Sequence, residues 1–294
     1  MFESKRLVHL TDPHLSSLDG MRMTDLRGKR WSGYLSWLKN RRRKYLPAVL
    51  EKLTTAVHAE GADQVLVTGD LVHIGLESEI EQAAAWLTTL GPPEQVMLVP
   101  GNHDSYAKDS TEWFQAHWRD NLSAEGEAQG PQVFPVVRKL GGLSLIGLST
   151  ACVTPVFMAS GELGATQLKK LETLLAQAAG EERPVVLLIH HPPLPGMTSR
   201  RKGLRDASEL QSLLERYPPP LVFHGHLHHN REYLWGDSRI YCTAAASSTS
   251  DASYRVIDIE DRSVRMRLKS ITVDDDGELV FATVDEQSWE MPVK

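Results

Sequence analysis

Five groups of polar residues in this sequence each follow directly after an apolar run, and every group offers side chains that can bind a metal ion. In chain order the groups are Asp12-Pro-His14, Gly69-Asp70, Gly101-Asn-His-Asp104, His190-His191 and Gly225-His-Leu-His228. Carboxylate, amide and imidazole groups gathered at one place would be costly unless a cation neutralised them. The mixture is too rich in imidazole for a dedicated Mg or Ca site and lacks the thiolates of a structural zinc site. It therefore suits Mn, Fe, Zn, Co or Ni.

Each group, taken alone, also fits a structural role. Asp12 and His14 could be a turn carboxylate beside a surface histidine. His9, inside its apolar run, is expected to be a strand histidine rather than a ligand. His191 lies one residue past His190, and in an extended chain its side chain would point to the opposite face, so it is not expected to bind metal. The metal hypothesis therefore depends on the groups coming together.

The segments around these groups alternate between two patterns. Short apolar runs bounded by Gly and Pro indicate buried strands, and amphipathic segments between them indicate helices at residues 47–60, 77–90, 111–122, 165–179 and 207–217. From Arg239 onward the pattern is typical of β-strands. This alternation predicts an α/β fold with a mixed sheet, and such sheets place ligands beyond the carboxyl ends of their strands. The polar groups are expected to meet at that edge.

Length and composition predict a single domain over residues 1–294. The chain is 41% hydrophobic, enough for one large core, and no Pro/Ser/Gly-rich linker or internal repeat divides it. The N-terminus carries no apolar signal segment, and no stretch is long enough to span a membrane. Cys152 and Cys242 are far apart, so free thiols in a reducing cytoplasm are expected rather than a disulfide. A cytoplasmic location is the prediction.

A basic insertion at about residues 22–45 interrupts the first part of the chain. It holds nine Lys or Arg residues and a single acid, although the net charge of the whole chain is −6. Trp31, Tyr34, Leu35 and Leu38 recur in it at helical spacing. An amphipathic basic helix can lie on an anionic membrane or cover a phosphate-bearing substrate, and it can equally be a flap packed on the body. Peripheral membrane contact through Trp31–Lys44 is one of these open alternatives.

The five groups, in this order, resemble the calcineurin-like metallophosphoesterase superfamily. The most specific part of the match is Gly-Asn-His-Asp at 101–104 followed by Gly-His-x-His at 225–228. The overall look is similar to bacterial cyclic-nucleotide phosphodiesterases within that superfamily. The resemblance implies a four-layer αββα sandwich with two mixed β-sheets. It also implies a binuclear metal-dependent phosphoric ester hydrolase that binds two divalent ions, Mn, Fe or Zn.

The resemblance implies a role for each residue of the set. The implied ligands are Asp12, His14 and His228 for one ion, Asn102, His190 and His226 for the other, and Asp70 as the bridge. Two ions held in this way would share an activated hydroxide and clamp the phosphoryl oxygens for in-line displacement. His103 would stabilise or protonate the leaving group, so His103 and Asp70 are the predicted catalytic residues.

One position departs from the pattern of the family. Gly-Asp is usually followed there by a second Asp that often orients the histidine of Gly-Asn-His, and this chain has His73 at that place. Either Asp104 or another acid takes over this role, or His103 is a weaker acid in this protein. A leaving group of low basicity, such as a nucleotide phosphate, would need less help.

The predicted function is hydrolysis of a phosphodiester, a cyclic nucleotide or a similar small anionic molecule, with Arg200, Arg201 and His73 as candidate substrate contacts. No nucleic-acid polymer is expected as a partner, and the oligomeric state is left open. One alternative is a pyrophosphatase or diesterase acting on a lipid-linked nucleotide or phospholipid at the membrane surface. A generic phosphomonoesterase and a non-catalytic scaffold are further alternatives. The scaffold is disfavoured because such proteins tend to lose metal ligands, and all seven are present here.

Overall fold

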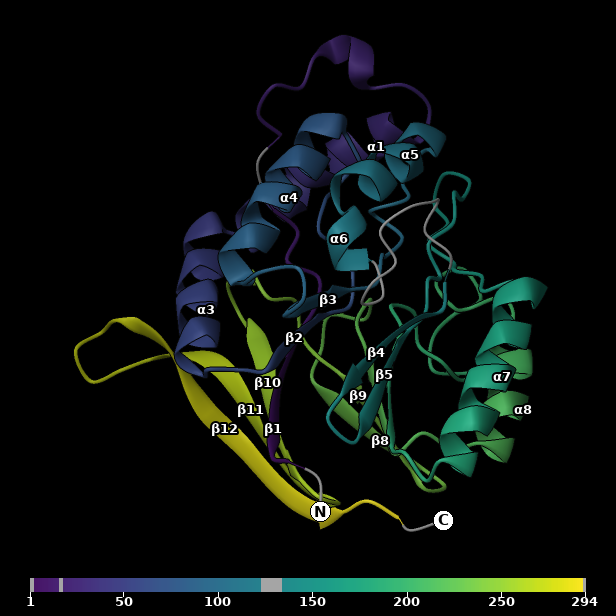
Figure 1. The fold of residues 1–294 in the computed structure, drawn as a ribbon. Helices are drawn as coiled ribbons and strands as arrows, with labels where there is room; N and C mark the ends of the chain where they lie inside the picture. Colours follow the sequence, from purple (N-terminus) through teal and green to yellow (C-terminus); the bar gives the residue numbers. More distant parts are fainter. Residues whose placement is uncertain (1–2, 16–17, 123–133, 293–294) are drawn as a thin grey trace.

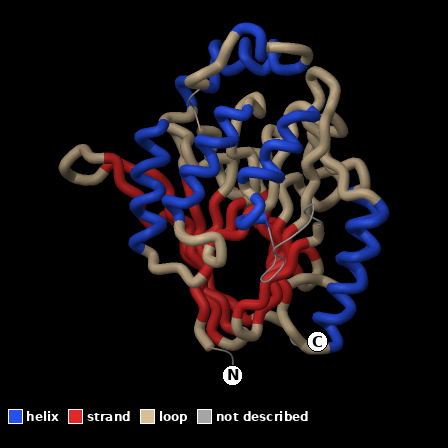
Figure 2. Tube along the Cα trace, turned by 45° about the horizontal axis from the view of Figure 1, so that its top comes forward, coloured by secondary structure: helices blue, strands red, loops and turns tan. Residues whose placement is uncertain are grey.

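Two β-sheets packed face to face, with helices on both outer sides, form the architecture of the protein (Figure 1). The structure is a computed structural model that describes residues 3–15, 18–122 and 134–292. Figure 2 shows the strands gathered at the centre and helices flanking them. The predicted αββα sandwich with two mixed sheets is confirmed.

The first sheet has the strand order β12-β11-β10-β1-β2-β3. Its strands are β1 (Lys5–Leu10), β2 (Gln64–Val67), β3 (Val96–Leu98), β10 (Ser253–Glu260), β11 (Ser263–Val273) and β12 (Leu279–Glu290). The first three are parallel to one another, and β10, β11 and β12 add antiparallel neighbours. Val65 pairs with Val8 on one side and with Val96 on the other, so the three parallel strands end close together.

The second sheet has the order β4-β5-β6-β7-β9-β8. Its strands are β4 (Val136–Leu140), β5 (Leu143–Gly147), β6 (Val185–Leu188), β7 (Leu221–His224), β8 (Arg231–Trp235) and β9 (Ser238–Cys242). The four central strands β5, β6, β7 and β9 are parallel, whereas β4 and β8 lie antiparallel at the two edges.

The hydrophobic core explains the layering. Leu7 and Leu66 of the first sheet share one buried cluster with Leu188 and Phe223 of the second, so this cluster fills the space between the sheets. A second cluster joins the opposite face of the first sheet to helices α3 (Pro47–Ala59) and α4 (Glu77–Leu90). A third joins the second sheet to α7 (Ala165–Gly180) and α8 (Ala207–Arg216). Strands buried on both faces read as continuous apolar runs, as the sequence does here.

Each polar group follows the carboxyl end of a parallel strand. Asp12 follows β1, Asp70 follows β2 and Asn102 follows β3, all in the first sheet. His190 follows β6 and His226 follows β7 in the second. Because the two sheets are stacked, these ends lie at one edge of the sandwich, where open α/β folds bind ligands.

The basic insertion forms helices that are fastened to this edge. It contains a short 3₁₀ turn (Met23–Asp25), α1 (Lys29–Ser36), a π-helical turn (Trp37–Arg41) and α2 (Arg42–Lys44). Arg30 of α1 is buried, donates hydrogen bonds to the carbonyls of Ile74 and Gly75, and pairs with Asp109 at 2.6 Å. A side chain at Gly33 would overlap Tyr106 and Ile74, so glycine permits this close approach of α1.

Two local predictions differ from the structure. The helix expected at 111–122 is two helices, α5 (Lys108–His117) and α6 (Arg119–Leu122), because the chain breaks at Trp118, whose side chain is fully buried. Strand β8 was not predicted, since its side chains are only partly buried and show no clean alternation. Within the part of the chain that the structure describes, no helix is both long and apolar enough to cross a bilayer.

Candidate metal centre

The first cluster of ligand-type side chains joins the loops after β1, β2 and β7. It consists of Asp12, His14, Asp70 and His228, whose ligand atoms all lie within 4.8 Å of one another. Asp12 Oδ1 is 3.0 Å from His228 Nε2 and 3.9 Å from His14 Nε2. The two imidazole Nε2 atoms are 3.4 Å apart.

A second cluster shares Asp70 with the first. It consists of Asp70, His190 and His226, again within 4.8 Å. His190 Nε2 is 3.4 Å from Asp70 Oδ2 and 3.3 Å from Asn102 Oδ1, so the amide oxygen of Asn102 belongs to the same group. The structure thus brings together all seven side chains that the sequence singled out, in the two predicted subsets.

His14 and His190 are held with Nε2 toward the clusters by hydrogen bonds at Nδ1. His14 Nδ1 lies 3.1 Å from the Val72 carbonyl, and His190 Nδ1 lies 2.7 Å from the Thr68 carbonyl. A carbonyl only accepts, so Nδ1 carries a hydrogen in both rings and Nε2 faces the cluster. Histidines that bind metals are typically oriented by such a bond at the second nitrogen.

Backbone conformation marks the same residues. Five of the seven have positive φ angles, which non-glycine residues seldom adopt: Asp12 at 51°, His14 at 39°, Asp70 at 55°, His226 at 68° and His228 at 53°. Left-handed backbone of this kind costs on the order of 1–3 kcal/mol per residue and concentrates at functional sites. Holding these five residues in this conformation therefore lowers the stability of the fold, and it sets the directions of their side chains.

Two glycines of the motifs make room for the carboxylates. A Cβ at Gly225 would overlap Asp12 Oδ2, and a Cβ at Gly101 would overlap Asp70 Oδ1. The glycines before His226 and Asn102 are therefore steric requirements of the clusters.

Two buried polar atoms support a cation at these clusters. Asp12 Oδ1 and His226 Nε2 are shielded from solvent and form no hydrogen bond among the described residues, since the 3.0 Å contact of Asp12 Oδ1 with His228 Nε2 is not a hydrogen bond. Buried polar groups without partners are rare in folded proteins and require an explanation. A divalent cation among carboxylate, imidazole and amide donors would satisfy both atoms, so the residues present fit such an ion.

The pKa values of the cluster histidines follow from burial and neighbouring charge. Burial lowers the pKa of His14 and of His226 well below the usual range, which leaves their lone pairs free at neutral pH. Burial alone would also lower the pKa of His190, but the adjacent Asp70 carboxylate raises it to about 9. The Asp70–His190 contact is therefore strongly attractive.

His103 is oriented by a backbone carbonyl and not by an acid. Its Nδ1 lies 2.5 Å from the carbonyl oxygen of His73, the residue at the position of the usual aspartate, and 3.2 Å from Arg41 Nη1. Its backbone N–H donates to Asp70 Oδ1 at 2.7 Å. Burial, together with the Arg41 guanidinium, lowers the pKa of His103 to about 3, so the free ring is neutral at pH 7.

Asp104 does not take over the missing role, contrary to one of the sequence-based alternatives. Its two carboxylate oxygens accept backbone N–H groups of Asp70 at 2.8 Å, Leu71 at 2.8 Å and Gly101 at 2.7 Å. Asp104 therefore connects the loop after β3, which carries Asn102, to the loop after β2, which carries Asp70.

Tyr45 and Arg41 reach the clusters from the basic insertion and were not predicted as site residues. The Tyr45 hydroxyl lies 2.7 Å from His228 Nδ1, and Arg41 contacts His103. Arg41 begins the basic run 41–44 and Tyr45 follows it, but only the folded path of the insertion shows which of these residues point toward the site. His191 lies near His226, yet both its ring nitrogens contact protein atoms, Thr150 Oγ1 and the Ala159 carbonyl.

A cleft of about 460 Å³ opens beside the second cluster. Asn102 and His103 line one part of it, and α1 and the segment 157–159 line others. Arg201 also lines this cleft, whereas Arg200 is exposed and outside the lining, and His73 is buried below the surface. Contacts of Arg200, Arg201 and His73 with substrate stay predictions.

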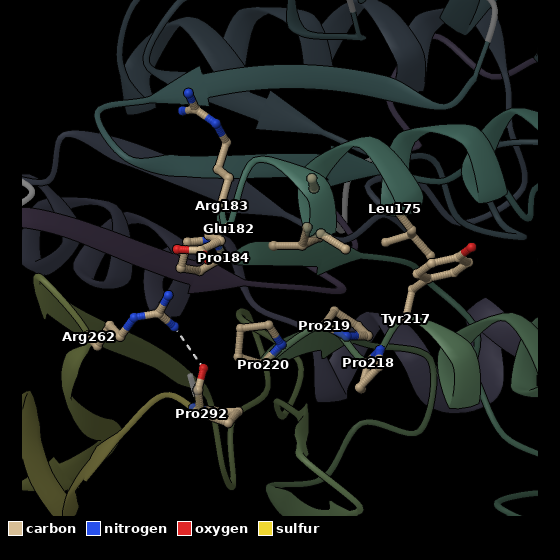
Figure 3. Close-up of a pocket in the computed structure, with 13 residues that line it drawn as sticks. Leu175, Glu182, Arg183, Pro184, Tyr217, Pro218, Pro219, Pro220, Arg262 and Pro292 are labelled. Carbon is tan, nitrogen blue, oxygen red and sulfur yellow. Dashed lines mark hydrogen bonds between the residues drawn. The ribbon is translucent and has the colours of Figure 1, made fainter. Parts of the chain in front are cut away.

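A small apolar pocket lies at the opposite edge of the second sheet (Figure 3). Pro184 and Pro220, which line it, precede β6 and β7, whereas the polar groups follow those strands. Its volume is about 50 Å³, and Arg262 closes one side by donating to the Pro292 carbonyl at 2.7 Å. This pocket is separate from the metal-type clusters.

This fold and this arrangement of side chains define a class of enzymes that hydrolyse phosphoesters with bound metal ions. The model of the calcineurin-like phosphoesterase family matches residues 5–230, a range that includes all five polar groups. The chain belongs to this family, and is a binuclear metal-dependent phosphoester hydrolase, as the sequence predicted.

Relatives with assigned names agree with that class. The 3',5'-cyclic adenosine monophosphate phosphodiesterase CpdA of Escherichia coli K12 is 28% identical over 241 residues, which cover 81% of this chain and 74% of that protein. A probable cyclic nucleotide phosphodiesterase of Rhodopseudomonas palustris is 34% identical over 178 residues, 58% of each chain. A dimetal phosphatase of Danio rerio has the same fold, with a TM-score of 0.66 at 14% identity, covering 98% of this chain and 99% of that one.

Proposed function

We propose that the protein hydrolyses a phosphodiester of a small anionic molecule, such as a cyclic nucleotide. The observation that carries this proposal is the pair of clusters that share Asp70, next to a cleft that Asn102 and His103 line. The names of the relatives support a diester over a monoester. All seven ligand-type residues are in place, which argues against a non-catalytic scaffold.

The proposed binding of metal uses the two subsets of the cluster. Asp12, His14 and His228 would hold one divalent ion. Asn102, His190 and His226 would hold the other, with Asp70 available to both. Bound ions of this kind supply a nucleophile at neutral pH and neutralise charge on the reacting phosphoryl group.

The side chains around the clusters have separate tasks. The His73 carbonyl fixes the ring of His103 at the cleft, where Nε2 can reach the leaving oxygen. Arg41 lies beside this ring and attracts the anionic ester. The Tyr45 hydroxyl orients the ring of His228 through its contact with Nδ1.

The test is a substrate panel assayed with Mn, Zn and Fe after removal of bound metal. Cyclic AMP, glycerophosphodiesters, bis(p-nitrophenyl) phosphate and p-nitrophenyl phosphate cover diesters and monoesters. We expect diesters to be hydrolysed faster than the monoester, and a chelator to abolish turnover until metal is restored. Full activity in the presence of the chelator, or activity on the monoester alone, would contradict the proposal.

A membrane-borne substrate is a second candidate, favoured by exposed apolar side chains on two neighbouring segments. Met23, Trp31 and Leu35 of the basic insertion are 64%, 46% and 49% exposed, and Phe157 in the facing loop is 77% exposed. The two segments are joined, because Lys29 Nζ donates to Thr154 Oγ1 and to the Met158 carbonyl. Apolar side chains beside a basic helix fit the surface of an anionic bilayer.

Sedimentation with vesicles of phosphatidylcholine and phosphatidylglycerol tests this candidate. The triple variant Arg42→Gln/Arg43→Gln/Lys44→Gln is expected to bind at least about 10-fold more weakly, because each basic residue near an anionic surface contributes about 1 kcal/mol. The exposed pair Lys169→Gln/Lys170→Gln on α7 serves as the matched control. Absence of wild-type binding, or equal loss in both variants, would rule the candidate out.

A further inference from the structure

Four cations line the cleft beside the second cluster. They are Lys29, Arg41, Arg201 and Lys202, and no Asp or Glu occurs among the described residues that line it. None of the four forms an ion pair within the described ranges of the chain, whereas the neighbouring Arg30 pairs with Asp109 and Arg205 pairs with Glu162. The cleft therefore holds positive charge that the protein does not neutralise.

Lys29 shows that this charge is built into the fold. Its ammonium lies 4.5 Å from the centre of the Tyr106 ring and donates to Thr154 Oγ1 at 2.6 Å and to the Met158 carbonyl at 3.1 Å. An ammonium has three N–H donors, and two of them have partners among the described residues. Burial lowers the pKa of Lys29 to about 8, so holding this charge costs free energy that an anionic ligand would recover.

Arg201 fixes the segment at Phe157, which also lines the cleft. Its guanidinium donates at 2.7 Å and 3.2 Å to the carbonyl of Phe157, a residue with a left-handed φ of 65° and a largely exposed ring. Strained backbone at an exposed aromatic residue suggests that the surrounding contacts hold this ring for a ligand. Arg201 thus binds the segment that Lys29 also contacts at Met158, and Lys202 and Arg41 line the same cleft.

Charge balance indicates what this cleft binds. The metal-type clusters, which lie behind Asn102 and His103, can neutralise the phosphate that reacts. A 3',5'-cyclic mononucleotide has no other phosphate, so the four cations of this cleft would have no negative charge on the substrate to bind. A diphosphate diester places its second phosphate next to the first, which matches a cationic cleft that begins at His103.

We propose that the cleft lined by Lys29, Arg41, Arg201 and Lys202 is a binding site for a second phosphate, so that the preferred substrate is a diester of diphosphate cleaved at its anhydride bond. This inference rests on the proposed function, in which the adjoining clusters bind the reacting phosphate. Water oxygen forms a bond to that phosphorus, and the bond from phosphorus to the bridging oxygen breaks. The electron pair leaves with the second phosphate, and the proton of the water passes to solvent.

This assignment gives a reason for the unusual surroundings of His103. A phosphate is a far less basic leaving group than an alkoxide and needs less protonation. The ring is held by a carbonyl, not by the carboxylate that would raise its basicity. A cationic cleft that stabilises the departing phosphate would compensate for a weak acid.

The test compares two substrates on the manganese-loaded enzyme. Diadenosine diphosphate carries two phosphates in one anhydride, whereas bis(p-nitrophenyl) phosphate carries one. The double variant Lys29→Ala/Lys202→Ala is expected to lower kcat/KM for the dinucleotide by about 30-fold, mainly through KM, because charge-assisted hydrogen bonds to the second phosphate are lost. For bis(p-nitrophenyl) phosphate the expected loss is no more than about 3-fold. Lys170→Ala, exposed on α7, is the matched control and should not change either value.

Equal losses on the two substrates, or no loss on the dinucleotide, would overturn the second-phosphate site. Efficient turnover of cyclic AMP with poor turnover of diadenosine diphosphate would also overturn it, and would leave the proposed phosphodiesterase intact. If no diester is hydrolysed, the proposed function fails, and calorimetry with AMP then decides the site. Wild-type enzyme should bind AMP at least about 10-fold more tightly than the double variant, and equal affinity would overturn the site.

Discussion

Replacing Asp70 with asparagine is expected to lower kcat/KM for a phosphodiester at least about 10³-fold, because this one carboxylate belongs to both clusters and would hold both of the proposed cations that polarise the reacting phosphate. Asp70 belongs to both groups of ligand-type atoms and lies 3.4 Å from His190 Nε2. Metal content should fall together with activity. Plasma mass spectrometry of the purified protein and steady-state kinetics measure the two effects.

The choice of asparagine separates a defect at the site from a defect of folding. The amide oxygen of asparagine can still accept the His103 backbone N–H that Asp70 Oδ1 accepts at 2.7 Å, so the loop after β3 should keep its position. Asp275→Asn, in the exposed turn between β11 and β12, is the control and should keep full metal content and activity. An Asp70→Asn protein with full metal and full activity would contradict the shared role of this residue.

The His103→Ala variant is expected to keep its metal but to lose about 10²-fold in kcat for a diester with an alkyl leaving group, since general acid catalysis contributes about 10²–10⁴-fold. The loss should be much smaller with p-nitrophenol, which leaves without protonation. Burial and Arg41 keep the free ring neutral, so the acid form must arise after an anionic ester has bound. Rates across a series of leaving groups of increasing pKa measure the effect.

His117→Ala, exposed on α5, is the matched histidine control. A slope of rate against leaving-group pKa that steepens only in His103→Ala would support the assignment. Unchanged turnover of every diester by this variant would show that His103 has no role at the leaving group.

The position of the metal-type residues could be predicted from sequence because it depends on strand topology. Asp12, Asp70 and Asn102 each follow an apolar run, and His190 and His226 do the same in the second half of the chain. Parallel strands deliver their carboxyl ends to one edge, so the order of motifs was enough to bring them together. The left-handed φ angles and the glycines that accommodate the carboxylates are local consequences of the same motifs.

The surroundings of His103 could not be predicted because they depend on tertiary placement. A backbone carbonyl that accepts a hydrogen bond leaves no mark in the sequence, so the contact between the His73 carbonyl and His103 could not be predicted. The sequence also left the Asp104 carboxylate available as a partner that could orient His103. Three backbone N–H groups occupy Asp104 instead. Likewise, Arg41 and Tyr45 reach the site because the insertion is fixed in two places, by Arg30 at the carbonyls of residues 74 and 75 and by backbone hydrogen bonds of Lys44 and Leu46 to residues 249 and 247.

Two elements were missed for reasons of packing. The break between α5 and α6 falls at Trp118, whose indole N–H donates to the Ile80 carbonyl at 2.9 Å in the core, a contact that helical periodicity does not reveal. In β8, Leu234 is 69% exposed, so the strand lacks the alternation that identifies a half-buried strand.

The central claim is that two divalent ions share Asp70, and anomalous diffraction from crystals of the manganese-loaded protein tests it most directly. The expected result is two anomalous peaks in each chain. One should lie among Asp12, His14 and His228, the other among Asn102, His190 and His226, with Asp70 between them. A single peak, or peaks away from these residues, would contradict the account.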